Sequence, residues 1–403
     1  MQIAIAGAGV GGLAAAALLA RAGHGVDVFD QFDTPAPVGS GLMLQETGLA
    51  VLGAMGLREL AEARGAPIHR LFGRSVPSGR TVLDVRFTAL RENLCAVGIQ
   101  RSALFDLLYA SALEAGAQFN GRVDVAEVDG AAGHVIERGS KSHGPFDLVI
   151  DAMGANSPLT SGADSMLPFG ALWASVDWDE AGPFDPHALE QRYRSARQMT
   201  GMMPSGAPRE GAVPTATYFW SLESGAYEDW RRQGLAAWRT EAEMLWPETA
   251  PVVAGLDEAT LTFARYRHRT WPRPVEGRLV HIGDSWHATS PQLGQGANMA
   301  LLDAYALCEA IVARPADLSG ALEAYLDQRS LHVQFYQTMS FLFTPVYQSR
   351  GAILPALRDW IASPLSRVPP APAVLAAMVS GALGSPLGRL GLKGGFQDEN
   401  GPT

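Results

Sequence analysis

The sequence contains only two cysteines, Cys95 and Cys308, among 403 residues, and they do not form a C-x-x-C motif. So few thiols exclude a disulfide-stapled fold and a cysteine-rich zinc site, and we expect no bound metal. The same scarcity favours a reducing cytoplasm as the location of the protein.

Basic residues are also in deficit. Lysine and arginine number 31 against 41 aspartates and glutamates, which gives a formal net charge of −10, and no basic run occurs. This balance argues against a nucleic-acid partner. No stretch reaches the roughly 18 consecutive apolar residues of a membrane-spanning helix, and the N-terminal apolar run lacks the basic segment of a signal peptide. We therefore expect a globular protein without an integral membrane segment.

Glycine, in contrast, is abundant and is arranged in motifs. Residues 7–12 read G-x-G-x-x-G, after a short apolar run that predicts a buried strand and before an Ala- and Leu-rich helix. In that setting Gly7 allows a tight turn, Gly9 lets the backbone approach a pyrophosphate, and Gly12 lets the helix pack on the strand. Free N–H groups at the positive helix end would then face phosphates.

A carboxylate follows at the expected distance. Residues 26–30 predict a second strand that ends in Asp30, and an acid about 20 residues past the glycines normally accepts hydrogen bonds from a ribose hydroxyl. It disfavours a 2′-phosphate on that ribose. A glycine turn in any α/β protein is the alternative, but the strand, the helix and the acid together favour a dinucleotide. This motif alone does not distinguish NAD from FAD.

A second glycine-rich segment, residues 283–298, makes that distinction. It follows a predicted strand at 278–282 and precedes a predicted helix at 297–311. Its pattern resembles that of the flavoprotein monooxygenases related to para-hydroxybenzoate hydroxylase, the group A aromatic hydroxylases. The matching positions are Gly283, Asp284, His287, Pro291, Gly294, Gln295, Gly296, Asn298, Asp303 and Ala304. No other segment forms a credible dinucleotide cradle.

The resemblance implies a function. Members bind FAD non-covalently, take electrons from transient NADPH or NADH, and hydroxylate an aromatic or conjugated small molecule with O₂ through a flavin C4a-hydroperoxide. The chemistry is centred on the flavin, so no catalytic side chain is assigned, and the Pro291 turn is expected near the flavin ring. Two alternatives remain: a dehydrogenase or reductase of the same fold, and a non-catalytic flavin-binding carrier.

The resemblance also implies the residues that would hold FAD. Asp284 would bond the ribityl hydroxyls, the amides that open the helix at Gly296 would face the flavin N1–C2=O edge, and His287 would only support the turn. The expected cofactor-binding residues are Gly7, Gly9, Val10, Gly11, Gly12, Asp30, Gln31, Gly41, Leu42, Arg101, Val125, Asp284, Pro291, Gly294, Gly296, Ala297 and Asn298.

One segment departs from the family pattern. Members usually carry an Asp-Gly motif at mid-chain, followed by an arginine, in a stretch linked to flavin and nicotinamide binding. Here Met153 replaces the acid and Thr160 replaces the arginine, whereas Gly154 and Ser157 remain. The choice between NADPH and NADH is therefore open, and Asp151 is a candidate to compensate.

The middle of the chain predicts a sheet over the cofactor. Residues 169–176, 198–203, 215–222 and 261–267 predict strands, with a helical patch at 230–246. The inner face of such a sheet would form the roof of an apolar, aromatic-friendly pocket. The candidate substrate contacts are Trp173, Met203, Tyr218 and Trp220, each of which has ordinary sheet core as its alternative.

The fold class is thus α/β: a Rossmann-like FAD-binding domain interleaved with a β-sheet substrate domain, plus C-terminal helices. We expect the FAD-binding domain at 1–70, 95–165 and 275–335, and the substrate domain at 71–94 and 166–274. A helical region at 336–392 and a flexible tail at 393–403 follow. Apolar residues of the helical region, including Phe341 and Trp360, predict helices packed on the flavin domain; a homodimer surface or a peripheral membrane contact is the alternative.

Overall fold

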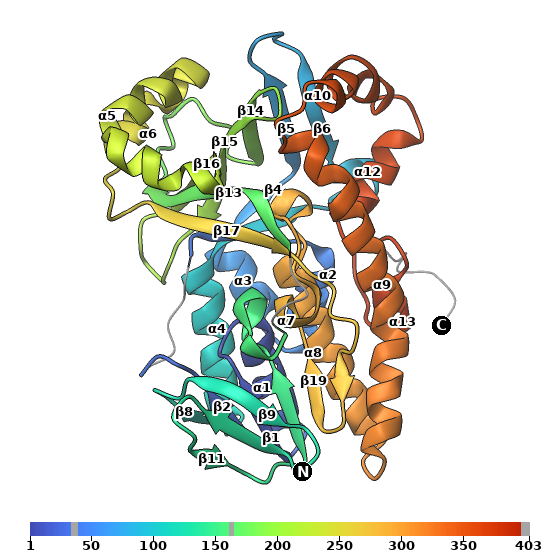
Figure 1. Ribbon diagram of the computed structural model, residues 1–403. Coiled ribbons are helices and arrows are strands. Elements are labelled where there is room, and N and C mark those ends of the chain that lie inside the picture. Colours follow the sequence, from blue (N-terminus) through green and yellow to red (C-terminus); the bar gives the residue numbers. More distant parts are fainter. Residues whose placement is uncertain (34–38, 161–164, 396–403) are drawn as a thin grey trace.

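The computed structural model describes residues 1–33, 39–160 and 165–395, and it shows an α/β protein built around two large sheets (Figure 1). A six-stranded sheet lies in the lower half of the view and a seven-stranded sheet in the upper half. The long helix α9 (Leu318–Tyr347) runs beside both. The predicted fold class is confirmed.

The six-stranded sheet has the order β18-β19-β12-β1-β2-β8, and its strands are parallel except at β18. Its bounds are β1 (Gln2–Ala6), β2 (Gly25–Phe29), β8 (Gln118–Asn120), β12 (Leu148–Asp151), β18 (Val275–Glu276) and β19 (Leu279–His281). Both predicted strands of the first glycine motif are present. The apolar runs are buried because parallel strands are covered on both faces.

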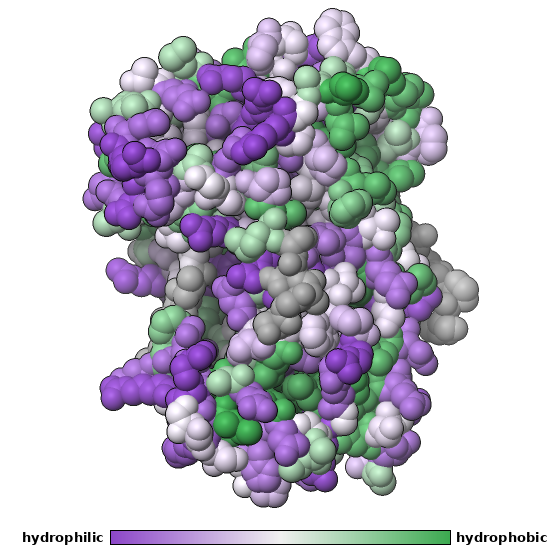
Figure 2. All heavy atoms as spheres, viewed as in Figure 1, coloured by the Kyte–Doolittle hydropathy of each residue, from purple (hydrophilic) through white to green (hydrophobic). Residues whose placement is uncertain are grey.

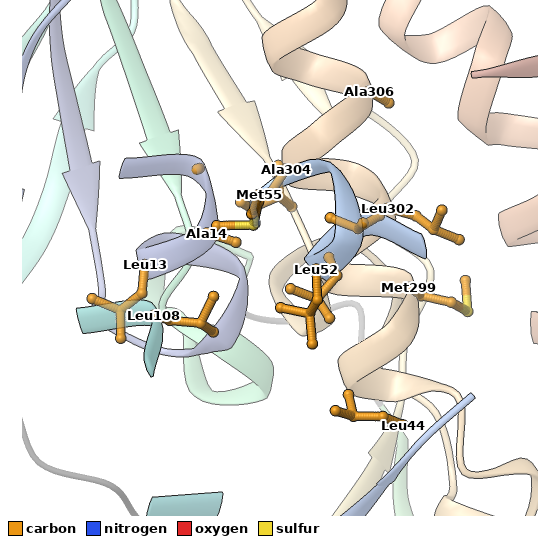
Figure 3. Close-up of a cluster of buried hydrophobic side chains, with 14 of the residues drawn as sticks. Leu13, Ala14, Leu44, Leu52, Met55, Leu108, Met299, Leu302, Ala304 and Ala306 are labelled. Carbon is orange, nitrogen blue, oxygen red and sulfur yellow. The ribbon is translucent and has the colours of Figure 1, made fainter. Parts of the chain in front are cut away.

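Helices cover one face of this sheet, and a small antiparallel sheet covers the other. The helices are α1 (Val10–Arg21), α4 (Arg101–Glu114) and α8 (Gly296–Ala313), and the small sheet consists of β9 (Val125–Asp129), β10 (His134–Glu137) and β11 (Ser142–His143). Figure 3 shows Leu13 of α1, Leu52 of α2 (Glu46–Ala54) and Leu302 of α8 in one buried cluster. The alanines of α1 let these helices approach closely.

The seven-stranded sheet has the order β17-β13-β16-β15-β14-β5-β6. Its strands are β5 (Arg70–Ser75), β6 (Thr81–Arg86), β13 (Ser165–Asp177), β14 (Ala188–Arg194), β15 (Gln198–Gly206), β16 (Thr215–Glu223) and β17 (Thr262–His268). The four strands predicted here are confirmed, as is the helical patch, which is α5 (Tyr227–Leu245). Helices α5 and α6 (Ala250–Ala254) cover the outer face of the sheet.

A third sheet joins the two halves. It has the order β3-β7-β4, with β3 (Gly41–Leu44), β4 (Ala66–Ile68) and β7 (Ala96–Gln100), and α3 (Arg58–Arg64) lies beside it. The Gln100 side chain donates to Thr215 Oγ1 of β16 over 2.7 Å. Gly98 approaches β15 so closely that a β-carbon there would lie 2.1 Å from Pro204 O. The two halves are therefore in direct contact beside the site described below.

The C-terminal helices differ from the expectation in where they begin. Helix α9 spans thirty residues with Pro345 inside it, so the predicted boundary between 335 and 336 falls within a helix. After it come α10 (Ile353–Leu357), a π-helical turn (Arg358–Ala362), α11 (Ser363–Leu365), α12 (Ala371–Val379) and α13 (Pro386–Arg389). Most of the predicted tail, residues 396–403, lies outside the described residues. The division into domains stays a prediction.

One helix among the described residues is long and apolar enough to cross a membrane, although no apolar run in the sequence suggested one. It is α8, and 67% of this 18-residue helix is buried inside the protein. Helix α8 packs against α1, α2 and α9. Its hydropathy is therefore that of a core helix.

Candidate functional site

A cavity of about 1270 Å³ lies between the two halves. This exceeds the range of roughly 300–1,000 Å³ typical for one small ligand. Its lower part is lined by the N-terminal residues of three helices: Val10 and Gly11 of α1, Arg101 of α4, and Gly296 and Ala297 of α8. Free N–H groups and positive dipole ends therefore meet at one place, which suits an anionic ligand.

The first glycine turn has the geometry that its sequence predicts. Gly7 has φ +101°, and a β-carbon there would lie 2.6 Å from Ala152 O. A β-carbon on Gly12 would lie 2.0 Å from Gly7 O, so only glycine lets α1 pack this close to the turn. Gly9 is different: the nearest atom to its β-carbon would be 4.0 Å away, and the residue lines the cavity. Gly9 thus presents bare backbone to open space.

The second glycine segment lines the same cavity and adjoins the first, since a β-carbon on Gly11 would lie 3.3 Å from Ala300 Cβ of α8. Asp284 begins α7 (Asp284–His287) after Gly283, whose φ is +61°. Its Oδ1 lies 3.7 Å from where a β-carbon of Gly296 would be, so the carboxylate and the start of α8 adjoin. Burial raises the pKa of Asp284, and nearby positive groups partly oppose that shift. Pro291 and Gly294 bound the short turn before α8, and both line the cavity.

His287 of the same segment faces away from the cavity. Its Nε2 lies 2.6 Å from Asp303 Oδ2, and Arg329 Nε donates to Asp303 Oδ1 over 2.7 Å; all three side chains are almost fully buried. The Gly283 N–H also donates to Asp303. Burial alone would raise the pKa of Asp303, but the charges of His287 and Arg329 and these hydrogen bonds lower it to about 2. The placement matches the turn-supporting role expected of His287.

Most of the expected cofactor residues come together on this cavity, but six do not line it. Gly9, Val10, Gly11, Gly41, Leu42, Arg101, Asp284, Pro291, Gly294, Gly296 and Ala297 line it, whereas Gly7, Gly12, Asp30, Gln31, Val125 and Asn298 do not. Gly7 and Gly12 shape the turn from behind. The Ala8 N–H donates to Asp30 Oδ2 over 2.9 Å, so Asp30 anchors the glycine turn. Gln31 is exposed, and Val125 is buried in the β9 core.

Asn298 is buried at 0% exposure, and its side chain is occupied by protein contacts. Its Oδ1 accepts from the Gln45 N–H over 2.8 Å, and its Nδ2 donates to Met43 O and Gly294 O. The side chain therefore joins β3 and the start of α2 to the Gly294 turn. Any contact of Asn298 with a cofactor would have to come from its backbone.

Asp151 organises the segment that departs from the family pattern. Its carboxylate accepts from the Met153 N–H over 3.0 Å and from Ser157 Oγ over 2.6 Å, and Oδ2 lies 2.8 Å from His281 Nδ1. Asp151 is fully buried, while Ala152, Gly154 and Asn156 line the cavity. Asp151 thus fixes the shape of this segment from inside, and the cavity wall there is backbone and small side chains.

The upper part of the cavity is enclosed by the seven-stranded sheet and the C-terminal helices. Trp173 and Met203 line it as expected. Tyr218 and Trp220 do not, because they lie on the opposite face of β16 and pack in a core with Trp238 of α5. Phe219 between them lines the cavity. The sequence placed this pair on the wrong face, since side chains alternate along a strand and one residue of offset reverses the facing.

Sequence reasoning missed the polar groups of this upper chamber. Trp173 Nε1 donates to Tyr266 Oη over 2.7 Å, and both side chains line the cavity. Tyr193, Gln191 and Tyr347 also line it, and Arg358 lies over the ring of Tyr347 with its guanidinium carbon 5.2 Å from the ring centroid. Tyr266 fell within a predicted strand, but its pairing with Trp173 depends on strand register, which the sequence did not reveal.

The residues present fit FAD. Gly9 leaves room for a pyrophosphate beside the start of α1, Asp284 and Arg101 offer a carboxylate and a guanidinium lower in the cavity, and α8 directs its N–H groups there. Gly39 has φ +104°, which favours glycine, and a β-carbon there would lie 3.3 Å from Arg101 Nε. An upper chamber remains beyond this region for a second, apolar molecule.

Comparison with known proteins gives consistent matches. A family model described as an FAD binding domain matches residues 1–338. The chain is 28% identical over 345 residues to an FAD-dependent urate hydroxylase of Klebsiella pneumoniae, and the match covers 82% of this chain and 86% of the relative. It is 27% identical over 379 residues to a kynurenine 3-monooxygenase of Salinispora tropica, covering 84% and 78%.

The fold matches solved structures along nearly its whole length. Klebsiella pneumoniae HpxO, solved in complex with FAD and uric acid, superimposes with a TM-score of 0.76 at 22% identity. That match covers 95% of this chain and 98% of HpxO. The arrangement of two sheets with a cavity between them is therefore a known architecture.

Proposed function

The chain belongs to the FAD-binding domain family, and we propose that it is an FAD-dependent monooxygenase that hydroxylates an aromatic or conjugated small molecule. The match to the family model confirms the family and the cofactor, FAD, that were expected from the two glycine segments. The observation that carries the proposal is the single cavity, which has three helix N-termini at one end and an aromatic-lined chamber at the other.

We assign the cofactor end to backbone groups and two charged side chains. Gly9 and the start of α1 would hold the pyrophosphate, Asp284 would accept hydrogen bonds from the ribityl hydroxyls, and Arg101 would contact a phosphate or the pyrimidine edge. The N–H groups that begin α8 would stabilise negative charge near the Pro291 turn. FAD, when bound, supplies the electron transfer and the reaction with O₂.

The upper chamber would position the substrate. Because the Trp173 N–H is donated to Tyr266 Oη, the Tyr266 hydroxyl keeps its own proton free to donate to a phenol or carbonyl oxygen in the chamber. Burial raises the pKa of Tyr266, so this hydroxyl stays protonated near neutral pH. Met203, Phe219 and Leu189 contribute apolar wall, which excludes water from the reacting groups.

The electron donor, the location and the assembly complete the proposal. NADPH or NADH would deliver electrons transiently, and the Met153 segment, shaped by Asp151, lies at the cavity wall where the family pattern places a nicotinamide-linked motif. We propose that the enzyme works in the cytoplasm on a small aromatic substrate, with O₂ as co-substrate and without nucleic acid. A homodimer is compatible with this function.

Isotope labelling tests the function directly. Purified protein is first checked for FAD released by heat, and it is then supplied with NADPH or NADH and a panel of mono- and bicyclic phenols under ¹⁸O₂. We expect NAD(P)H oxidation to accelerate with an accepted phenol and ¹⁸O to appear in the product. Product oxygen derived only from water, or turnover without O₂, would assign the protein to the dehydrogenases instead. Retained FAD with no turnover on any donor would favour a carrier.

A further inference from the structure

An apolar surface covers the outside of the C-terminal helices. We define the C-terminal face as the exposed side chains of residues 353–374: Ile353, Leu354, Leu357, Trp360, Ile361, Leu365, Val368 and Val374. Ile353 is 76% exposed and Trp360 is 61% exposed. Figure 2 shows hydrophobic residues gathered at the upper right, over α10 and α12. Contiguous patches of this kind mark interaction sites, whereas single exposed apolar residues need no explanation.

The segment behind this face is a thin wall of the active-site cavity. Ala362, Ser363 and Ser366 of the same turns line the cavity, while Trp360, Ile361 and Leu365 point outward. The groove formed by Ile353, Leu357 and Trp360 is almost wholly apolar. A ligand bound to the C-terminal face would therefore lie within one helical turn of the substrate chamber.

The charges at this face are opposite in sign to those of the whole protein. The chain carries a net charge of −10, yet residues 350–374 contain three arginines and one acid. That acid, Asp359, is paired with the buried Arg358. Arg350 is exposed but paired with Glu223. Within the described part of the chain, the exposed cations of this face without an acidic partner are Arg367 and Arg80, and the Arg80 guanidinium lies 3.7 Å above the Trp360 ring. An indole with a basic partner is the arrangement that proteins place at a membrane–water boundary.

We propose that the C-terminal face docks peripherally on an anionic lipid bilayer. Its aliphatic side chains and Trp360 enter the acyl boundary, and Arg80 and Arg367 meet the headgroup charges. A second copy of the chain is a poorer occupant, because two such faces would bring like charges together. Docking would place the substrate chamber beside the bilayer, where apolar aromatic molecules concentrate. This inference goes beyond the proposed reaction and does not depend on it.

Vesicle co-sedimentation of the FAD-loaded protein tests the proposal without turnover. The probes are phosphatidylcholine vesicles with and without phosphatidylglycerol. The double variant Ile353→Ser/Trp360→Ser should lower the partition coefficient of the protein between water and vesicles at least about tenfold. The reason is that transfer of each apolar side chain from water into the bilayer favours binding. The matched control is Val213→Ser/Met244→Ser, which removes two equally exposed apolar side chains elsewhere and should bind like the parent.

The charge component is tested separately. Arg80→Gln/Arg367→Gln should weaken binding to the anionic vesicles only, and added salt should mimic it. FAD absorbance and thermal melting establish that each variant is folded. The proposal is overturned if the parent protein fails to sediment with anionic vesicles, or if the control variant loses binding equally. It is also overturned if light scattering shows a dimer that Ile353→Ser/Trp360→Ser dissociates while vesicles leave it unbound.

Discussion

The two ends of the cavity are built in different ways. The cofactor end is made mainly of backbone: the turn at Gly7 to Gly12, the Gly294 turn and three helix starts. The substrate end is made of side chains from strands and helices far apart in the sequence, such as Trp173, Tyr266 and Tyr347. A site built from closely packed backbone has little room for added atoms, whereas side chains that line a chamber can be replaced or can reorient. Substitutions at the cofactor end should therefore damage folding or FAD binding, whereas substitutions at the substrate end should have smaller effects.

The largest effect is expected where the cofactor end has no space. Gly12→Ala would place a carbon 2.0 Å from Gly7 O, so the turn and α1 must move apart. We expect a loss of about 3 kcal/mol in the free energy of unfolding, measured by urea denaturation of the apoprotein. Gly9→Ala is the matched control, because its β-carbon would meet nothing closer than 4.0 Å. It should keep the fold and lose FAD affinity; equal unfolding of both variants would contradict the distinction.

The next effect separates holding FAD from supporting the turn. Asp284→Ala should reduce FAD affinity by about 1.5–3 kcal/mol, the value of a charge-assisted hydrogen bond, with little change in apoprotein stability. His287→Ala should do the reverse, because it leaves Asp303 without its 2.6 Å partner in a buried site. Fluorescence titration of the apoprotein with FAD and thermal melting measure the two quantities. Equal FAD affinity in the two variants would refute the assignment.

A smaller effect is expected at the substrate end. Tyr266→Phe removes one hydroxyl donor, and we expect the product formed per NAD(P)H consumed to fall about fivefold, which is about 1 kcal/mol. FAD affinity should not change. Trp173→Phe removes the hydrogen bond that orients Tyr266 and part of the ring that packs on Phe219, but it leaves the Tyr266 hydroxyl in place. It should therefore shift coupling in the same direction by less. Loss in Trp173→Phe with none in Tyr266→Phe would mean that the tryptophan acts by packing alone.

The smallest effect concerns the contact between α9 and the C-terminal segment. His332 Nδ1 accepts from Arg329 and its Nε2–H donates to Gly381 O, so the ring is neutral. Burial and the Arg329 charge lower the pKa of His332 to about 3. Because this is below the unfolded value of about 6.5, the unfolded chain takes up the proton first. Stability is therefore lost as pH falls from about 6.5 toward the folded pKa.

We expect about 1 kcal/mol of this loss over the first pH unit below 6.5. His332→Gln should flatten the pH dependence of the urea midpoint in that range. His134→Gln, a substitution in the small sheet, is the control and should keep the parent slope. An unchanged slope in His332→Gln would show that other groups govern the acid sensitivity.

The sequence predicted the two glycine turns and the helices that follow them, because the determinants of these elements are local. The turn at Gly7 and the start of α8 are set by residues adjacent in the chain, so a motif is enough to predict both. The substrate end depends on facing and on distant partners. Tyr218 and Trp220 were assigned to the wrong face because alternation fixes relative orientation but not which side is covered by α5. The contact between Tyr347 and Arg358 of the C-terminal segment could not be predicted either, because nothing in the local sequence indicates it.

Helix α9 joins the two ends, and Pro345 changes what that connection means. Thirty residues give a rod of about 45 Å, anchored near its middle by the Arg329–Asp303 pair. Pro345 has no N–H to donate, so the bond that would brace the last turn to Phe341 O is missing. Val346 and Tyr347, which line the cavity, lie beyond that gap. The last turn of α9 is held instead by the Gln348 N–H, which donates to Thr344 O, and by Arg358, which donates to Val346 O. With one backbone hydrogen bond fewer, we expect this part of the chamber wall to adjust to substrates of different shape more readily than the glycine turns at the cofactor end.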